Sequence, residues 1–160
     1  MPPAAAPLRP IPGNDCLAGA DADAAPKTRG EQPMPRISVI FLTIAALCGL
    51  SGMVWGAYMG ASGDHTMMPA HAHLNLLGWA SLAIMGLFYA QPAAPRGRLA
   101  WANLWLSSAG AILMAPMLAW LLGGHERQMG PWMMIPEALV FLGLVCFLID
   151  VLLSGRRGRL

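Results

Sequence analysis

Two histidines and an asparagine stand close together at the start of a long apolar stretch of the sequence. His71, His73 and Asn75 lie within residues 69–79, and polar side chains are costly inside a membrane segment unless they have a partner or a function. Imidazole is a common metal and haem ligand, and a carboxamide can orient such a ligand or meet its polar groups. The stretch is therefore the first candidate for a cofactor site, and no catalytic residue is predicted.

Helical spacing separates these two histidines. A helix turns by about 100° per residue, so His71 and His73 point roughly 200° apart. The His71 face also carries Asn75 and Gly78, and a small residue near an imidazole leaves room for the edge of a porphyrin. His71 is therefore the first candidate ligand of a haem iron, with His73 as the alternate and Asn75 as an orienting group.

The composition is that of a membrane protein. Of the 160 residues, 56% are hydrophobic and only 11% are charged, which is far more apolar than a soluble domain. The lysines and arginines form short clusters beside apolar runs, as topology signals do, so we expect a lipid bilayer as the environment and no nucleic-acid partner. The three cysteines are far apart and form no CxxC motif, so no disulfide framework is predicted.

Four apolar runs predict four membrane-spanning helices, since each is near the roughly 20 residues that a helix needs to cross a bilayer. They lie at about 37–59, 71–91, 99–122 and 131–153. Short connections make consecutive helices antiparallel neighbours, so the fold class is an all-α, up-down four-helix bundle over residues 36–155. A Pro/Ala-rich tail, residues 1–35, is expected to be disordered, with Met34 as an alternative translation start, and residues 156–160 form a basic tail.

The basic clusters also predict an orientation. Lysines and arginines lie at both ends of the four-run region and in the connection between the second and third runs. Arg127 alone lies on the opposite side. By the positive-inside rule, we expect a multi-pass protein with both termini cytoplasmic; the resemblance described below implies that the membrane is a bacterial inner membrane. All four histidines then fall on the outer side: His65, His71, His73 and His125.

Further candidates lie on or near the same side. His125, Met133 and Met134 could supply a second axial ligand, because His/His and His/Met pairs both bind haem iron; His71 of a second copy in a homodimer is another source. Glu137 sits more than a turn inside the fourth run, and an ionisable group at that depth is a functional candidate. Asp150, near the other end of that run, is expected to be interfacial.

The residues around His71 also carry a family resemblance. Pro69, Ala70 and His71, followed by Gly78, resemble the second transmembrane helix of subunit I of haem–copper oxidases, in the cbb3-type and nitric oxide reductase branch. The string MPAHAHLNLLGW at residues 68–79 is similar to short bacterial proteins described as stand-alone subunit-I-like domains. The resemblance covers about residues 37–153 and is most specific in the second run.

This resemblance implies a cytochrome c oxidase subunit I-like fold, b-type haem bound by His71, and a role in electron transport in a respiratory chain. A full oxidase subunit takes its remaining haem and copper ligands from later helices, which this chain lacks, so it is not a complete terminal oxidase. Asn103 and Ser107 stand where relatives often carry histidines, so a second haem ligand from the third run is missing. Met68 stands where many relatives have an arginine, so a contact to a haem propionate is missing there.

Two alternatives use the same residues differently. Histidine and methionine side chains gathered on the outer side suit copper, which would make the chain a copper-binding or copper-delivery protein. The other alternative is a cofactor-free structural or assembly subunit that works with other respiratory membrane subunits.

Overall fold

The computed structural model describes residues 33–157 of the chain. Residues 1–32 of the predicted disordered tail and residues 158–160 of the predicted basic tail lie outside the described residues.

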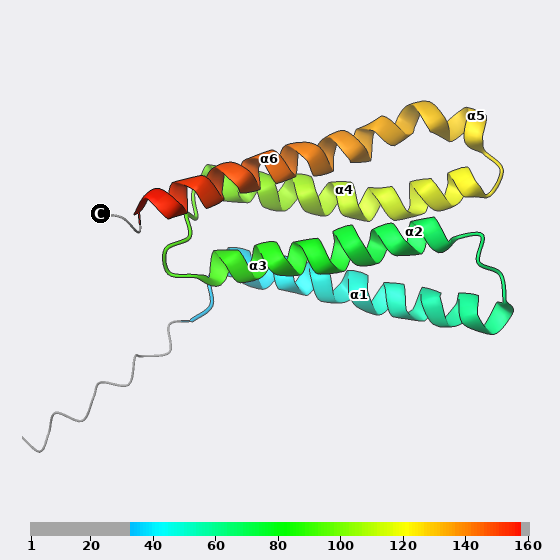
Figure 1. Ribbon diagram of the computed structural model, residues 1–160, viewed down its shortest axis with the longest axis horizontal. Helices are drawn as coiled ribbons and strands as arrows, with labels where there is room; N and C mark the ends of the chain where they lie inside the picture. Colours follow the sequence, from blue (N-terminus) through cyan, green and yellow to red (C-terminus); the bar gives the residue numbers. More distant parts are fainter. Residues whose placement is uncertain (1–32, 158–160) are drawn as a thin grey trace, which may run out of the picture. The chain divides into compact units, whose positions relative to one another are not determined.

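Every regular element of the described residues is a helix, and successive long helical segments run in opposite directions (Figure 1). The second long segment changes from α-helix to π-helix, whose hydrogen bonds run from residue i to residue i+5, and back to α-helix. In chain order the elements are α1 (Arg36–Ser62), α2 (Met68–His73), η2 (Leu74–Ser81), α3 (Leu82–Ala90), α4 (Arg98–Leu122), α5 (Glu126–Met129), η3 (Gly130–Met133) and α6 (Met134–Arg157).

Four helical segments are long and apolar enough to cross a membrane, which confirms the prediction of four spans. They are Arg36–Ser62, Met68–Ala90, Arg98–Leu122 and Arg127–Gly155. These segments indicate a multi-pass membrane protein, because about 20 apolar helical residues span the hydrocarbon of a bilayer.

The first span ends later, and the second begins earlier, than predicted, each for a local reason. α1 continues to Ser62 and stops at Gly63, whose φ of 70° is left-handed and whose N–H donates to the Met59 carbonyl at 3.0 Å. Glycine adopts that conformation without steric cost. The second span begins at Met68 rather than 71, because Pro69 fits the first helical turn, where a missing N–H costs nothing.

The apolar core lies toward the end of the bundle that carries the start of α1, the α3–α4 connection and the end of α6; we call this the termini end. Phe41 of α1 stacks on Tyr89 of α3 with ring centroids 5.5 Å apart, and both side chains are fully buried. Leu82 and Leu104 complete the contact between the second and third spans. This end is filled by close-packed side chains.

Glycines bring α4 and α6 into close contact. A Cβ added at Gly110 would lie 2.8 Å from the backbone nitrogen of Val140, and one added at Gly143 would lie 2.9 Å from the backbone nitrogen of Ser107. Small residues let helix backbones approach closely in membranes. α4 and α6 therefore form one closely packed pair (Figure 1).

Candidate cofactor site

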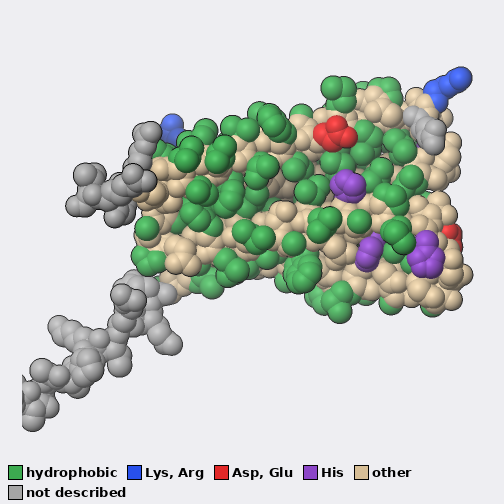
Figure 2. All heavy atoms as spheres, in the orientation of Figure 1, with side chains coloured by type: hydrophobic (Ala, Val, Ile, Leu, Met, Phe, Trp, Pro, Cys, Tyr) green, Lys and Arg blue, Asp and Glu red, His purple; other side chains and the backbone are tan. Residues whose placement is uncertain are grey.

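The opposite end of the bundle carries the α1–α2 and α4–α5 connections, and we call it the histidine end. Figure 2 shows histidine side chains gathered toward it. They do not converge, however: within residues 33–157 no group of three or more histidine, cysteine, aspartate or glutamate side chains could hold a metal ion.

The His71 side chain packs against α1. Asn75 Nδ2 donates to the His71 carbonyl at 3.0 Å and lies 3.2 Å from the ring nitrogen Nε2. A Cβ added at Gly56 would lie 3.0 Å from His71 Cε1, and one added at Gly52 would lie 2.8 Å from Asn75 Cγ. The imidazole and carboxamide therefore fit spaces that two glycines leave in α1.

The other two candidates in the second span lie elsewhere. His73 is exposed, on a different face from His71 as helical spacing predicts, with Nδ1 2.8 Å from the Pro69 carbonyl oxygen. Gly78 is buried, and a Cβ added there would lie 2.9 Å from Cys48 Sγ. The space beside Gly78 is thus filled by Cys48, and the helix contact explains this glycine without a porphyrin edge.

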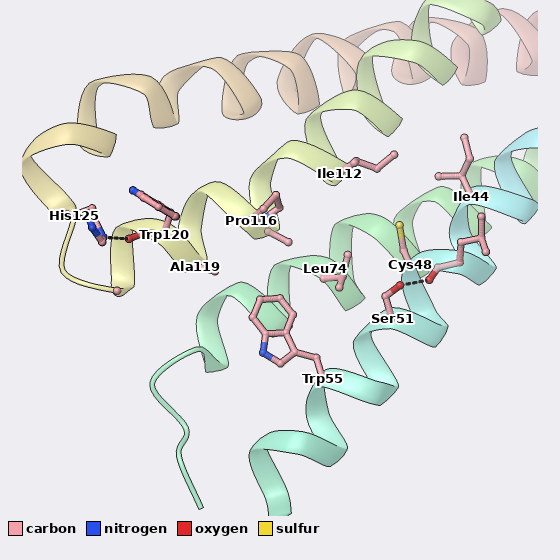
Figure 3. A pocket seen from close by; sticks show the side chains of 13 residues that line it. Ile44, Cys48, Ser51, Trp55, Leu74, Ile112, Pro116, Ala119, Trp120 and His125 are labelled. Carbon is pink, nitrogen blue, oxygen red and sulfur yellow. Dashed lines mark hydrogen bonds between the residues drawn. The ribbon is translucent and has the colours of Figure 1, made fainter. Parts of the chain in front are cut away.

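A cavity of about 680 Å³ lies between α1, η2 and α4 at the histidine end (Figure 3). Its walls are mainly apolar and include two tryptophans, Trp55 and Trp120; the others are Ile44, Leu47, Cys48, Ser51, Leu74, Ile112, Ala115, Pro116, Ala119, Gly123 and His125. Pockets for drug-sized ligands and cofactors span about 300–1,000 Å³ and are mostly apolar with a few polar groups. This cavity therefore has the size and lining of a cofactor site.

His125 is the histidine that lines this cavity. Its ring lies on Trp120, with centroids 4.6 Å apart and planes inclined by 32°, and its Nδ1 is 3.2 Å from the Trp120 carbonyl oxygen (Figure 3). The chain turns back toward Trp120 through Gly124, whose φ of 94° favours glycine. When Nδ1 donates to a carbonyl, Nε2 keeps its lone pair, which is the usual state of a metal-binding imidazole.

The remaining outer-side candidates lie away from this cavity. Met133 is half-buried, Met134 is 72% exposed and Glu137 is exposed, and none of them lines the cavity. These three candidates therefore do not share the cavity wall with His125.

The α1–α2 connection holds a charged group outside the spans. The hydroxyl of Thr66 donates to Asp64 Oδ1 at 2.6 Å and its backbone N–H at 2.9 Å. These two hydrogen bonds stabilise the ionised form, so they lower the pKa of the Asp64 carboxyl. The residue stays negative next to His65 near neutral pH.

A buried polar chain at the termini end was not anticipated. Tyr89 donates its hydroxyl to Asp150 at 2.8 Å, Asn103 donates to the Tyr89 oxygen at 3.0 Å, and Ser107 donates to Asn103 at 2.8 Å. Asp150, which was expected near the membrane interface, is only 2% exposed, because Tyr89 of another span packs against it. Sequence spacing within one helix cannot show such a contact.

The fold and this site define the class of the molecule as a multi-pass membrane protein with a large apolar cavity bordered by one histidine. Comparisons of the chain with protein-family models, with curated proteins and with solved structures find no match.

Proposed function

We propose that this chain binds a b-type haem in the cavity between α1, η2 and α4, with His125 as the axial ligand, and that it serves electron transfer or an accessory role in a respiratory membrane complex. One observation carries the proposal: an imidazole whose Nδ1 contacts a backbone carbonyl borders a mostly apolar cavity of about 680 Å³. The proposal keeps the haem expected from the sequence and moves its ligand from His71 to His125.

The side chains that line the cavity favour binding of a planar, mainly apolar ligand. Trp55 and Trp120 offer large aromatic surfaces, and aromatic rings stack on flat ligands. The Trp120 carbonyl holds the His125 ring and selects the tautomer with a free Nε2. A bound haem supplies a one-electron couple, whose potential depends on axial ligand, burial and hydrogen bonding to that ligand.

The lining also predicts the coordination of the iron. Besides His125, the cavity-lining side chain that can ligate iron strongly is Cys48, and it lies at the opposite end of the cavity from His125 (Figure 3). One copy of the chain therefore offers one axial ligand at a time. We expect a five-coordinate, high-spin haem unless another molecule supplies the sixth ligand.

The test is a reduced-minus-oxidised spectrum of the full chain, purified in mild detergent and titrated with haem. We expect a b-type signal that His125→Ala abolishes and that the matched variant His71→Ala preserves. Ala119→Trp, which fills the cavity without touching a ligand, should weaken haem binding by on the order of tenfold or more, since it occupies the binding volume.

Other outcomes would decide between the alternatives. Loss of the signal in His71→Ala but not in His125→Ala would restore the ligand first expected from the sequence. A colourless preparation with stoichiometric copper would favour copper handling. A preparation that binds neither, and co-purifies with a respiratory complex, would favour a structural or assembly subunit.

A further inference from the structure

A carboxyl group is buried within the fourth span, at the termini end. Asp150 belongs to the span Arg127–Gly155 and is 2% exposed. It lies less than two helical turns from the last residue of that span, or roughly 7.5 Å along the helix axis. Ionisable side chains inside membrane spans are rare and often bind or transfer protons. This carboxyl is therefore a functional candidate, and it does not line the haem cavity.

The buried polar chain points all of its donors toward this carboxyl. The Ser107 hydroxyl donates to Asn103 Oδ1 at 2.8 Å, and Asn103 Nδ2 donates to the Tyr89 hydroxyl oxygen at 3.0 Å. The Tyr89 hydroxyl in turn donates to Asp150 Oδ2 at 2.8 Å. Hydrogen bonds in such a series polarise one another. Tyr89 is therefore a strengthened donor to the carboxyl, built from side chains of three spans.

The bond from Tyr89 suits both protonation states of Asp150. An ionised carboxylate accepts a hydrogen bond at Oδ2, and a protonated carboxyl keeps a carbonyl oxygen that also accepts. Tyr89 can therefore donate to Asp150 whether or not a proton is bound. Burial disfavours the ionised form, whereas the donated hydrogen bond favours it. These opposing effects allow both forms to exist in the folded bundle.

The charged and titratable groups around this carboxyl come from neighbouring elements. Tyr89 belongs to α3, and Cys146, which is half-buried, lies one turn before Asp150 on α6. Arg96 of the α3–α4 connection is exposed, and its Nε donates to the Tyr89 carbonyl at 3.2 Å. Arg98, the first residue of α4, is also exposed. The exposed Arg96 side chain, bonded to the backbone of Tyr89, indicates that the water boundary lies close to the buried carboxyl.

We propose that Asp150 is a proton-binding site inside the termini end of the bundle, with Tyr89 as the residue that positions its carboxyl. In the binding step, a hydronium ion of the surrounding water gives its proton to the carboxylate and becomes water. One O–H bond forms and one breaks, no electron is transferred, and the interior of the bundle loses one negative charge. The site is independent of the haem proposal, because neither Asp150 nor Tyr89 lines the haem cavity.

The test is infrared difference spectroscopy of the full chain in mild detergent, between an acidic and an alkaline pH at which it stays folded. We expect a C=O band of a protonated carboxyl that appears on acidification and shifts in D₂O. The band should be absent from Asp150→Asn and present in the matched variant Glu137→Gln, which changes an exposed carboxyl of the same helix. A difference spectrum that Asp150→Asn leaves unchanged overturns the proposal, since the carboxyl then keeps one protonation state.

The positioning role of Tyr89 has its own readout. A hydrogen bond to a carbonyl oxygen lowers its stretching frequency, so Tyr89→Phe should raise the frequency of the Asp150 band. An unchanged frequency overturns this role and leaves Tyr89 as a packing residue. The thermal midpoint of each variant shows whether it folds. If Asp150→Asn does not fold, Asp150→Glu replaces it: it keeps a carboxyl, so a pH-dependent band at a shifted frequency supports the site, and an unshifted band overturns it.

Discussion

The two ends of the bundle are built differently, although the same four spans form both. At the termini end, Phe41, Tyr89 and Leu104 are fully buried, and a chain of hydrogen bonds joins α3, α4 and α6. At the histidine end, the spans leave a cavity of about 680 Å³ between α1 and α4. Close side-chain packing is therefore concentrated at the termini end, and the open volume at the histidine end.

The polar groups differ in the same way. Hydrogen bonds between spans join the side chains of Tyr89, Asn103 and Asp150. Removing one of these side chains therefore leaves its partners buried without hydrogen bonds. His71 and Asn75 interact within one span, and His125 interacts with a carbonyl only five residues before it. The hydrogen bonds of these histidines therefore join residues of the same segment and do not tie different spans together.

The largest effect on stability should come from opening the packed end. Phe41→Ala removes a fully buried ring that stacks on Tyr89, so we expect a loss of about 3–5 kcal/mol in the free energy of unfolding. Thermal unfolding in detergent, followed by intrinsic fluorescence or aggregation, measures it. Trp55→Ala, in the wall of the cavity, should change the midpoint much less; equal losses would show that the two ends are equally packed.

A smaller loss should follow from filling the space that α1 leaves for His71. In Gly56→Leu the new side chain must displace the His71 ring, since even a Cβ would lie 3.0 Å from Cε1. Overpacking of this kind costs about 1–3 kcal/mol. Gly60→Leu is the matched control, because nothing lies within 4 Å of a Cβ there. If both variants unfold at the wild-type midpoint, the α1–His71 contact is not closely packed.

The smallest effect concerns the charged connection at the histidine end. Thr66→Ala removes the hydroxyl that donates to Asp64, so the pKa of Asp64 should rise toward its ordinary value. Because the folded-state pKa is the lower one, this carboxylate stabilises the fold above its unfolded pKa, and the contribution is lost as pH falls through the folded pKa. NMR titration of the carboxyl checks it. A pKa that stays the same in the variant would mean that the backbone N–H alone lowers it.

The sequence predicted the spans well because apolar length is a local property. Runs of about 20 apolar residues mark membrane helices whatever their neighbours are, and all four appear in the structure. The second span begins earlier than predicted because Pro69 lies within its first turn. The opposed faces of His71 and His73 also followed from helical spacing, since both residues belong to one short helix.

The candidate site could be predicted only in part. The sequence offered residue types that can bind a haem or a metal, with His125 among them, but which of these residues borders a cavity depends on packing between α1, η2 and α4. The turn through Gly124 that returns the ring to Trp120 is likewise a feature of the folded chain. No spacing along one helix could rank His125 above His71.

The sequence alone determined that the chain has four apolar helices, and that its histidines stand near the ends of two of them, because helix formation and membrane insertion depend on neighbouring residues. The tertiary structure decided which histidine packs against glycines and which borders an open cavity. It also decided that Asp150 is buried against Tyr89. Those outcomes depend on contacts between residues far apart in the chain, which only the packing of the four spans creates.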